Sequence, residues 1–339
     1  MKPSLSLDTY AEALNCVLEK HSVVTLDGFV LDLKRVKWRD GDSSIVGPPV
    51  LLLPGLLQTS GTYLVGTNSL AMHLLRSGFD VWLGNNRSGK HVSFSTYHSR
   101  VWDWDVTDMA QNDIPALLNS INTLRKDTTP VSIIAHSQAT TQCIYLLNSS
   151  IPLLNLGKIV LLAPAVYMGP LFYKLPFISF MRSLPDKLFN AVFGPTAFMP
   201  MLMHLGSLLG HLPGYGTLSY SVFATIFHWD DHLWDKRIRN HLFMSSPSYV
   251  STKTIKWWLH GGDEDEESEP ISNIIPIQSP PILAIVAGND LLVDGERFLK
   301  LLHNHHKSII IEEYAHLDVL WAYNVIDKVG RPIVDFLNT

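Results

Sequence analysis

The feature that most constrains the fold is a short apolar run that stops at a serine. The run covers residues 131–135, is rich in β-branched residues, and leads through His136 to Ser137 and a helix-compatible segment. A strand, a sharp turn and a helix in this order raise a side chain above the edge of a parallel sheet. Alanines stand two positions on each side of the serine, where strand and helix pass close together. The pattern is typical of a nucleophile elbow; a plain turn whose serine caps the helix is the alternative.

Short apolar runs alternate with longer helical patterns along much of the chain. Strands are expected at 22–25, 30–36, 50–53, 80–83, 131–135, 159–162, 282–287 and 308–312, and helices at 69–77, 110–123, 138–147, 295–303 and 325–337. This alternation predicts βαβ units and a mostly parallel central sheet flanked by helices. We therefore expect a single α/β domain over residues 1–339.

The alternation breaks between residues 164 and 281. This segment is rich in Phe, Leu and Met, and prolines and glycines interrupt it. It could be a second packed helical domain or a cap over the carboxyl edge of the sheet, and the two readings are compatible. We expect an inserted, mainly helical cap over 164–281 whose apolar inner surface forms a substrate cavity.

Composition excludes some classes of protein. The net charge of -5 gives no basic surface for nucleic acid. Two cysteines do not make a disulfide framework and fit a reducing compartment. The first residues lack the apolar stretch of a secretory signal, and no apolar run reaches the ~18 residues of a membrane span. We expect an intracellular protein, either cytoplasmic or attached peripherally to a lipid or membrane surface.

Two clusters of polar residues, at 263–269 and 303–306, are candidate metal sites. The acidic stretch 263–269 is expected to be a solvated loop because like charges repel. The histidines of 303–306 lie between a predicted helix and a predicted strand, with no carboxylate or cysteine at ligand spacing. We expect neither a metal nor an organic cofactor.

A serine nucleophile needs a base, and the base needs an orienting acid. Asp290 follows the apolar run 282–287, and His316 follows the run 308–312. Ser137, Asp290 and His316 thus appear in the order serine, acid, histidine, each beyond a predicted strand. We predict that they form a catalytic triad.

Three neighbours are rival candidates for these roles. Asp294 is expected on the loop or first turn of the next helix, and Asp318 could brace the histidine loop instead. His136 precedes the serine, and at an elbow this side chain points away from the substrate.

The negative charge that develops on the substrate carbonyl needs backbone N–H donors. One candidate is the N–H of Gln138, directly after the serine. The other is the N–H of Leu56, in the Pro-Gly-Leu-Leu turn that follows the run 50–53.

Motifs along the whole chain resemble those of one known family. Segments 68–71 (NSLA) and 78–87 (GFDVWLGNNR) are very similar to its N-S-L-A and G-Y-D-V-W-L-G-N-x-R motifs. Other similar segments are 21–31, 49–57, 102–105, 108–116, 135–140, 227–229, 288–292 and 316–321. On these residues the chain resembles the acid lipase family of α/β hydrolases, which includes gastric and lysosomal acid lipases and fungal steryl ester hydrolases. The resemblance implies an α/β-hydrolase fold and the same triad and oxyanion donors as above.

Three residues depart from the family's pattern. Pro54 stands where the family has a histidine, and Ala135 and Ala139 stand where the elbow has glycines. Proline removes one backbone N–H and fixes φ, and each alanine adds a Cβ atom where packing is tight. We expect these changes to affect the catalytic efficiency and the choice of substrate more than the identity of the triad.

The resemblance implies a serine ester hydrolase that forms an acyl-enzyme on Ser137. Its substrates would be hydrophobic carboxylic esters such as acylglycerols, steryl esters or a lipophilic metabolite, and the apolar cap could contact a lipid droplet or membrane surface. The altered elbow leaves two alternatives open: an acyltransferase or thioesterase-like enzyme of specialised metabolism, and a non-catalytic homologue that binds lipid. Three triad residues beyond strand ends argue against the last.

Overall fold

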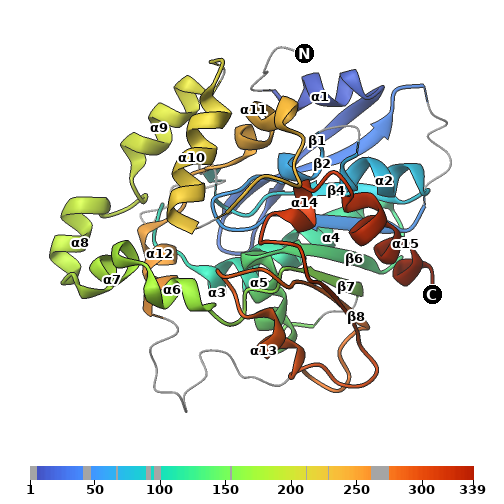
Figure 1. Ribbon diagram of the computed structural model, residues 1–339. Helices are drawn as coiled ribbons and strands as arrows, with labels where there is room; N and C mark the ends of the chain where they lie inside the picture. The colour runs from blue at the N-terminus through green and yellow to red at the C-terminus, as the bar shows by residue number, and fades with distance from the viewer. Residues whose placement is uncertain are drawn as a thin grey trace.

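The computed structural model describes residues 6–40, 47–65, 68–88, 93–94, 101–152, 155–210, 212–227, 229–260 and 275–339. In these ranges the chain forms one sheet with helices on both faces and a helical insertion to one side (Figure 1). The acidic stretch 263–269 lies outside the described residues.

Within the described ranges the sheet has nine strands. The eight on its main path are ordered β1-β2-β4-β3-β6-β7-β8-β9, and the short β5 pairs with β2. Their bounds are β1 Cys16–Val24, β2 Phe29–Trp38, β3 Pro49–Leu53, β4 Asp80–Gly84, β5 Ser93–Phe94, β6 Val131–His136, β7 Leu156–Leu162, β8 Ile282–Ala287 and β9 Lys307–Ile311. β2 pairs antiparallel with β1, β4 and β5, and every other pairing is parallel. The predicted α/β fold with a mostly parallel sheet is confirmed.

The central strands are apolar throughout because both faces of the sheet are covered. Along β3, Leu51 and Leu53 pack into one hydrophobic cluster, whereas Val50 and Leu52 pack into the other. The first cluster includes side chains of α4 (Ile114–Arg125) and α5 (Gln138–Leu147). The second includes those of α1 (Leu7–Ala13), α2 (Leu70–Arg76), α14 (Asp318–Trp321) and α15 (Arg331–Asn338). The alternation of the strand places successive side chains in different cores.

Two predicted helices begin with a wider turn than expected. A π-turn at Met109–Asp113 follows α3 (Val106–Asp108) and precedes α4, and another at Ile326–Gly330 precedes α15. Each is followed by a proline at the start of the α-helix, which cannot donate an N–H to the preceding turn. The helix expected at 295–303 ends earlier, as α13 (Gly295–Leu299), because residues 301 and 302 bond three residues back.

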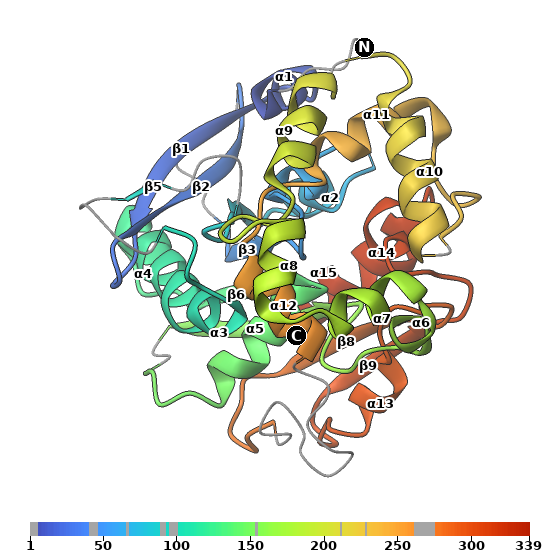
Figure 2. The ribbon, with the colours of Figure 1, turned by 90° about the vertical axis from the view of Figure 1, so that its left-hand side faces the viewer.

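The insertion lies between β7 and β8. Its helices are α6 Pro170–Lys174, α7 Pro176–Ser183, α8 Asp186–Phe193, α9 Pro200–Leu209, α10 Tyr215–Phe227, α11 Arg239–Leu242 and α12 Thr252–His260. Short 3₁₀ turns flank α11 at Lys236–Ile238 and Phe243–Ser245. Figures 1 and 2 show α8 and α9 on the outside of this layer, away from the sheet. We call it the cap and keep the bounds 164–281 as our interpretation. None of the helices in the described ranges combines the length and apolar character of a bilayer crossing.

Candidate active site

Ser137 occupies a sharp turn between β6 and α5. Its backbone has φ 52° and ψ −121°, a region that non-glycine residues rarely adopt. Hydrogen bonds hold this conformation: Ser137 N–H donates to the carbonyl of Leu162 (3.0 Å), and its own carbonyl accepts from the N–H (2.8 Å) and hydroxyl (2.6 Å) of Thr140. Such over-determined strain is a feature of functional turns.

The neighbourhood of the elbow is crowded. A Cβ atom added to Gly55 would lie 2.9 Å from the Cβ of Ser137 and 3.0 Å from His136 Nδ1, so this position requires glycine. Ala135 and Ala139 are fully buried in the same core cluster. The elbow therefore forms with alanine in place of the family's two glycines.

The structure brings the three predicted triad residues together at the carboxyl edge of the sheet. His316 Nε2 lies 2.8 Å from Ser137 Oγ, and His316 Nδ1 lies 2.6 Å from Asp290 Oδ2. The other carboxylate oxygen of Asp290 accepts from the N–H groups of Leu292 (2.9 Å) and Val293 (3.3 Å). The carboxylate is thus fixed on both sides, and it fixes the imidazole in turn.

The rival residues have other roles. Asp294 caps α13 by accepting from the N–H of Arg297 (2.9 Å). Asp318 accepts from the N–H of Ala315 (2.6 Å) and from Trp234 Nε1 (2.6 Å), and its burial raises its pKa to about 6. Asp318 therefore braces the loop that carries His316, the alternative that its sequence position had left open.

His136 links the elbow to two other loops. Its Nδ1 lies 3.0 Å from Gln58 Oε1, and its Nε2 lies 3.3 Å from the carbonyl oxygen of His316. Burial, and secondarily the nearby His316, lowers the pKa of His136 well below its usual value, so the ring is neutral at pH 7. The position of His136 at the elbow argues against it as the base, but no sequence pattern reveals this network.

The turn after β3 approaches the elbow from the other side. The N–H of Gly55 donates to Gln58 Oε1 (3.3 Å), and Leu57 has a positive φ of 61°. Among the described residues, the backbone N–H groups of Leu56 and Gln138 donate to no protein acceptor. Gln138 is the first residue of α5, where the N–H groups lack intrahelical partners and the helix end favours negative charge. Leu56 and Gln138 remain predicted oxyanion donors.

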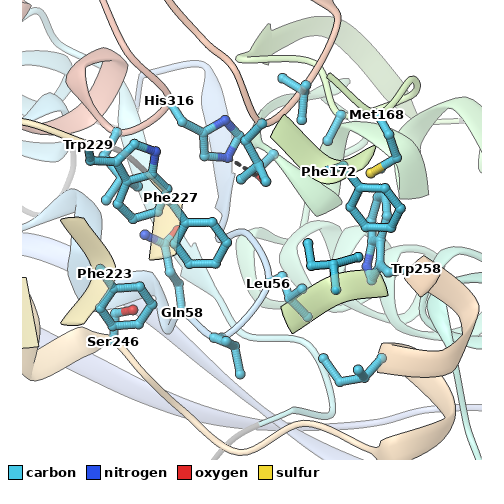
Figure 3. A pocket seen from close by; sticks show the side chains of 18 of the residues that line it. Leu56, Gln58, Met168, Phe172, Phe223, Phe227, Trp229, Ser246, Trp258 and His316 are labelled. Atoms are coloured by element: carbon cyan, nitrogen blue, oxygen red, sulfur yellow. Dashed lines mark hydrogen bonds between the residues drawn. The ribbon is translucent and has the colours of Figure 1, made fainter. Parts of the chain in front are cut away.

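A cavity between the sheet edge and the cap opens onto Ser137 and His316. The cap contributes an apolar wall: Met168, Phe172, Ile178, Met181, Phe223, Phe227, Trp229, Phe243, Ile255, Trp258 and Leu259. The Trp229 ring is nearly parallel to the imidazole of His316, at 9° with ring centroids 6.1 Å apart. Figure 3 shows both side chains among those that line the cavity. Within the described residues no cluster of three or more His, Cys, Asp or Glu side chains could hold a metal.

Comparison with known proteins agrees with this fold. A model of the α/β-hydrolase fold matches residues 48–323, and one of a partial α/β-hydrolase lipase region matches 7–67. Sterol esterase 2 of Saccharomyces cerevisiae is 34% identical, over 98% of this chain and 71% of its own length. Human gastric triacylglycerol lipase is 25% identical, over 94% of this chain and 87% of its own. The chain belongs to the acid lipase family of α/β hydrolases.

As an acid lipase family member, the chain is a carboxylic ester hydrolase. A solved structure of similar fold is a soluble variant of the Saccharomyces cerevisiae monoglyceride lipase, with TM-score 0.60 at 15% identity, covering all of this chain and 96% of that one. In segment 227–229, one of those similar to the family's motifs, Phe227 and Trp229 line the cavity, and residue 228 lies outside the described residues.

Proposed function

We propose that this chain cleaves hydrophobic carboxylic esters through an acyl-enzyme on Ser137. The observation that carries the proposal is the continuous contact from Ser137 through His316 to Asp290, at the floor of an apolar cavity. A structural serine would need neither the imidazole nor the carboxylate behind it.

The geometry supports a two-step reaction. His316 Nε2 accepts the proton of Ser137 as its oxygen attacks the ester carbon, and Asp290 stabilises the resulting imidazolium. The N–H groups of Leu56 and Gln138 bind the oxyanion. His316 then protonates the departing alcohol, and a water that His316 deprotonates releases the acid from Ser137.

The cavity lining supports lipophilic substrates such as acylglycerols, steryl esters or a lipophilic metabolite. The leaving oxygen must come within hydrogen-bond distance of His316 Nε2 to be protonated. Because Trp229 stacks on that imidazole and on Phe227 (centroids 4.8 Å apart), the alcohol part of the ester would lie against this aromatic wall.

Replacing the nucleophile tests the reaction. Ser137→Ala should reduce hydrolysis of nitrophenyl butyrate to background and abolish labelling by a fluorophosphonate, with its melting temperature close to that of the wild type. Assaying with added alcohols distinguishes water from an alcohol as acyl acceptor. Unchanged hydrolysis by Ser137→Ala would rule out this mechanism.

We also propose that the outer face of the cap docks on a phospholipid surface. Apolar side chains of α8, α9 and α10 that are at least 49% exposed are Leu188, Val192, Met201, Leu202, Leu205, Leu208, Leu218 and Val222. So much exposed apolar surface is unusual on a soluble monomer. The inner side of the same layer lines the cavity, so docking would place the cavity beside its lipid supply.

The charge distribution favours the same orientation. Residues 188–229 contain no Asp, Glu, Lys or Arg. The wider segment 170–229 has three basic residues and one acidic residue, a net charge of +2, which leaves -7 for the rest of the chain. An anionic lipid surface would attract the cap and repel the rest of the molecule.

Vesicle flotation tests the docking surface. The double variant Met201→Asp, Leu205→Asp should lose flotation with phosphatidylcholine–phosphatidylserine vesicles and keep wild-type hydrolysis of soluble nitrophenyl butyrate. Leu26→Asp, in the β1–β2 turn and 98% exposed, is the matched control and should still float. Flotation of the double variant to the wild-type extent would contradict docking through α9.

A further inference from the structure

Two tryptophans of the cap donate their indole N–H groups to residues beside the candidate catalytic groups. Trp258 Nε1 lies 2.8 Å from Oε1 of Gln138, the residue directly after Ser137. Trp234 Nε1 lies 2.6 Å from Oδ1 of Asp318, two residues after His316. We propose that Trp234 and Trp258 are positioning residues. They hold the turn that carries Ser137 (the nucleophile turn) and the loop that carries His316 (the base loop) in their reactive geometry. This inference rests on the proposed function and concerns its rate.

The Trp258 bond fixes the start of α5. Gln138 is 2% exposed, and its only other side-chain contact within hydrogen-bond reach in the described residues is a weak one, from Nε2 to Met109 Sδ at 4.0 Å. The indole is therefore the strong partner of a buried amide, whose oxygen would otherwise lack a donor. Because the backbone N–H of the same residue is the predicted oxyanion donor, movement of this side chain would move the donor away from the reacting oxygen.

The Trp234 bond acts on the other side of the site. Asp318 uses one oxygen for this indole and the other for the N–H of Ala315, the residue before His316. Trp234 is itself held by an isolated β-bridge to Ala322 and by edge-to-face packing on Trp321, with ring centroids 5.0 Å apart. The carboxylate thus ties the base loop to the cap at a buried point.

Both anchors come after the charge-free segment 188–229 in the chain. The cap therefore has two functional parts. The earlier helices, α6 to α10, supply the exposed apolar face and part of the cavity wall. Residues 234–260 supply the rest of the wall and also contact the loops that carry Ser137 and His316. Removing these contacts should slow the chemical step even for a small ester that hardly touches the cavity wall.

The adjacent Trp257 provides a matched control for Trp258. It lies in the same helix, packs on Tyr145 (centroids 5.9 Å), and its indole N–H makes no hydrogen bond in the described part of the chain. Phenylalanine at either position keeps an aromatic ring and removes the N–H.

Trp258→Phe should lower kcat on nitrophenyl butyrate about tenfold with KM changed less than twofold, as expected for the loss of one buried hydrogen bond. Fluorophosphonate labelling of Ser137 should slow by the same factor. Trp257→Phe should leave all three values unchanged.

A double-mutant cycle tests whether the effect runs through Gln138. Gln138→Met keeps the length of the side chain without its acceptor, and the Trp258→Phe, Gln138→Met double variant should be no slower than the slower single variant. Trp234→Phe should likewise lower kcat about tenfold, and it should add to Trp258→Phe because the two bonds are separate.

The proposal is wrong if Trp258→Phe keeps the wild-type kcat, raises only KM, or matches Trp257→Phe. It is also wrong if the Trp258 and Gln138 effects simply add. None of these outcomes affects the proposed function, which fails only if Ser137→Ala remains active.

Discussion

The carboxyl edge of the sheet and the inner face of the cap meet at one cavity, yet they are built differently. At the sheet edge, Ser137, His316 and Asp290 are held by directional hydrogen bonds of 2.6 to 3.3 Å. The cap wall is almost entirely aromatic and aliphatic, with Ser246 as its polar exception among the lining residues. On the proposed function, the hydrogen-bonded edge would carry out the reaction, whereas the apolar wall of the cap would select the ester.

The largest effect is expected at the edge. Asp290→Asn should lower kcat on nitrophenyl butyrate by about 10³ to 10⁴, because an amide cannot hold the Nδ1–H tautomer or stabilise the imidazolium. Asp294→Asn is the control, since asparagine also caps a helix, and it should retain near-wild-type kcat. A larger loss of kcat in Asp294→Asn than in Asp290→Asn would mean that Asp294 is the catalytic acid. The contact between His316 and Asp290 would then not be the one used in the reaction.

The sequence predicts the sheet edge better than it predicts the cap, and the reason is physical. The runs 131–135 and 282–287 match β6 and β8 within one residue because strands buried on both faces are continuously apolar. Ser137 and Asp290 follow these two buried strands, so the sequence predicts their place in the fold. His316 follows β9, which ends the sheet and is largely exposed, but its apolar residues still mark it as a strand. β1 extends well before the expected 22–25, because its solvent-facing residues break the apolar pattern.

The cap was predictable only as an apolar insertion. Helices α9 and α10 show no clean amphipathic stripe, since side chains such as Met201 and Leu218 are apolar and exposed while the inner faces are also apolar. The contacts between Trp258 and Gln138, and between Trp234 and Asp318, join residues 120 and 84 positions apart. No local pattern encodes such pairings, and packing alone selects them.

Asp318 lies where the sheet edge and the cap meet, and its titration predicts how the stability of this contact depends on pH. Its pKa of about 6 in the folded chain exceeds the ordinary 3.8, mainly through burial. The folded state therefore binds this proton more tightly than the unfolded state does, so the contribution to stability is present below pH ~4 and is lost as pH rises through ~6. The free energy of unfolding of the wild type, relative to Asp318→Asn, should fall by up to about 3 kcal/mol over that range.

Urea unfolding of both proteins between pH 4 and pH 7 measures this difference. Groups that titrate alike in both proteins cancel, so the asparagine variant serves as the internal control for every other carboxylate. A difference in unfolding free energy between the two proteins that stays constant with pH would contradict the raised pKa of Asp318. It would show that the two hydrogen bonds of the carboxylate offset its burial.

The smallest effect is expected on the cap wall, and it should depend on the substrate. Phe227 lines the cavity and stacks on Trp229, whereas Val222, in the same helix, is 49% exposed. Phe227→Ala should lower kcat/KM roughly tenfold for esters of bulky apolar alcohols, because the lost ring contact removes part of the binding energy for the alcohol. It should change kcat/KM less than threefold for ethyl butyrate, and Val222→Ala should leave both esters unaffected. Equal losses on both esters would place Phe227 among the groups that hold His316, and would move the boundary between chemistry and selectivity into the cap.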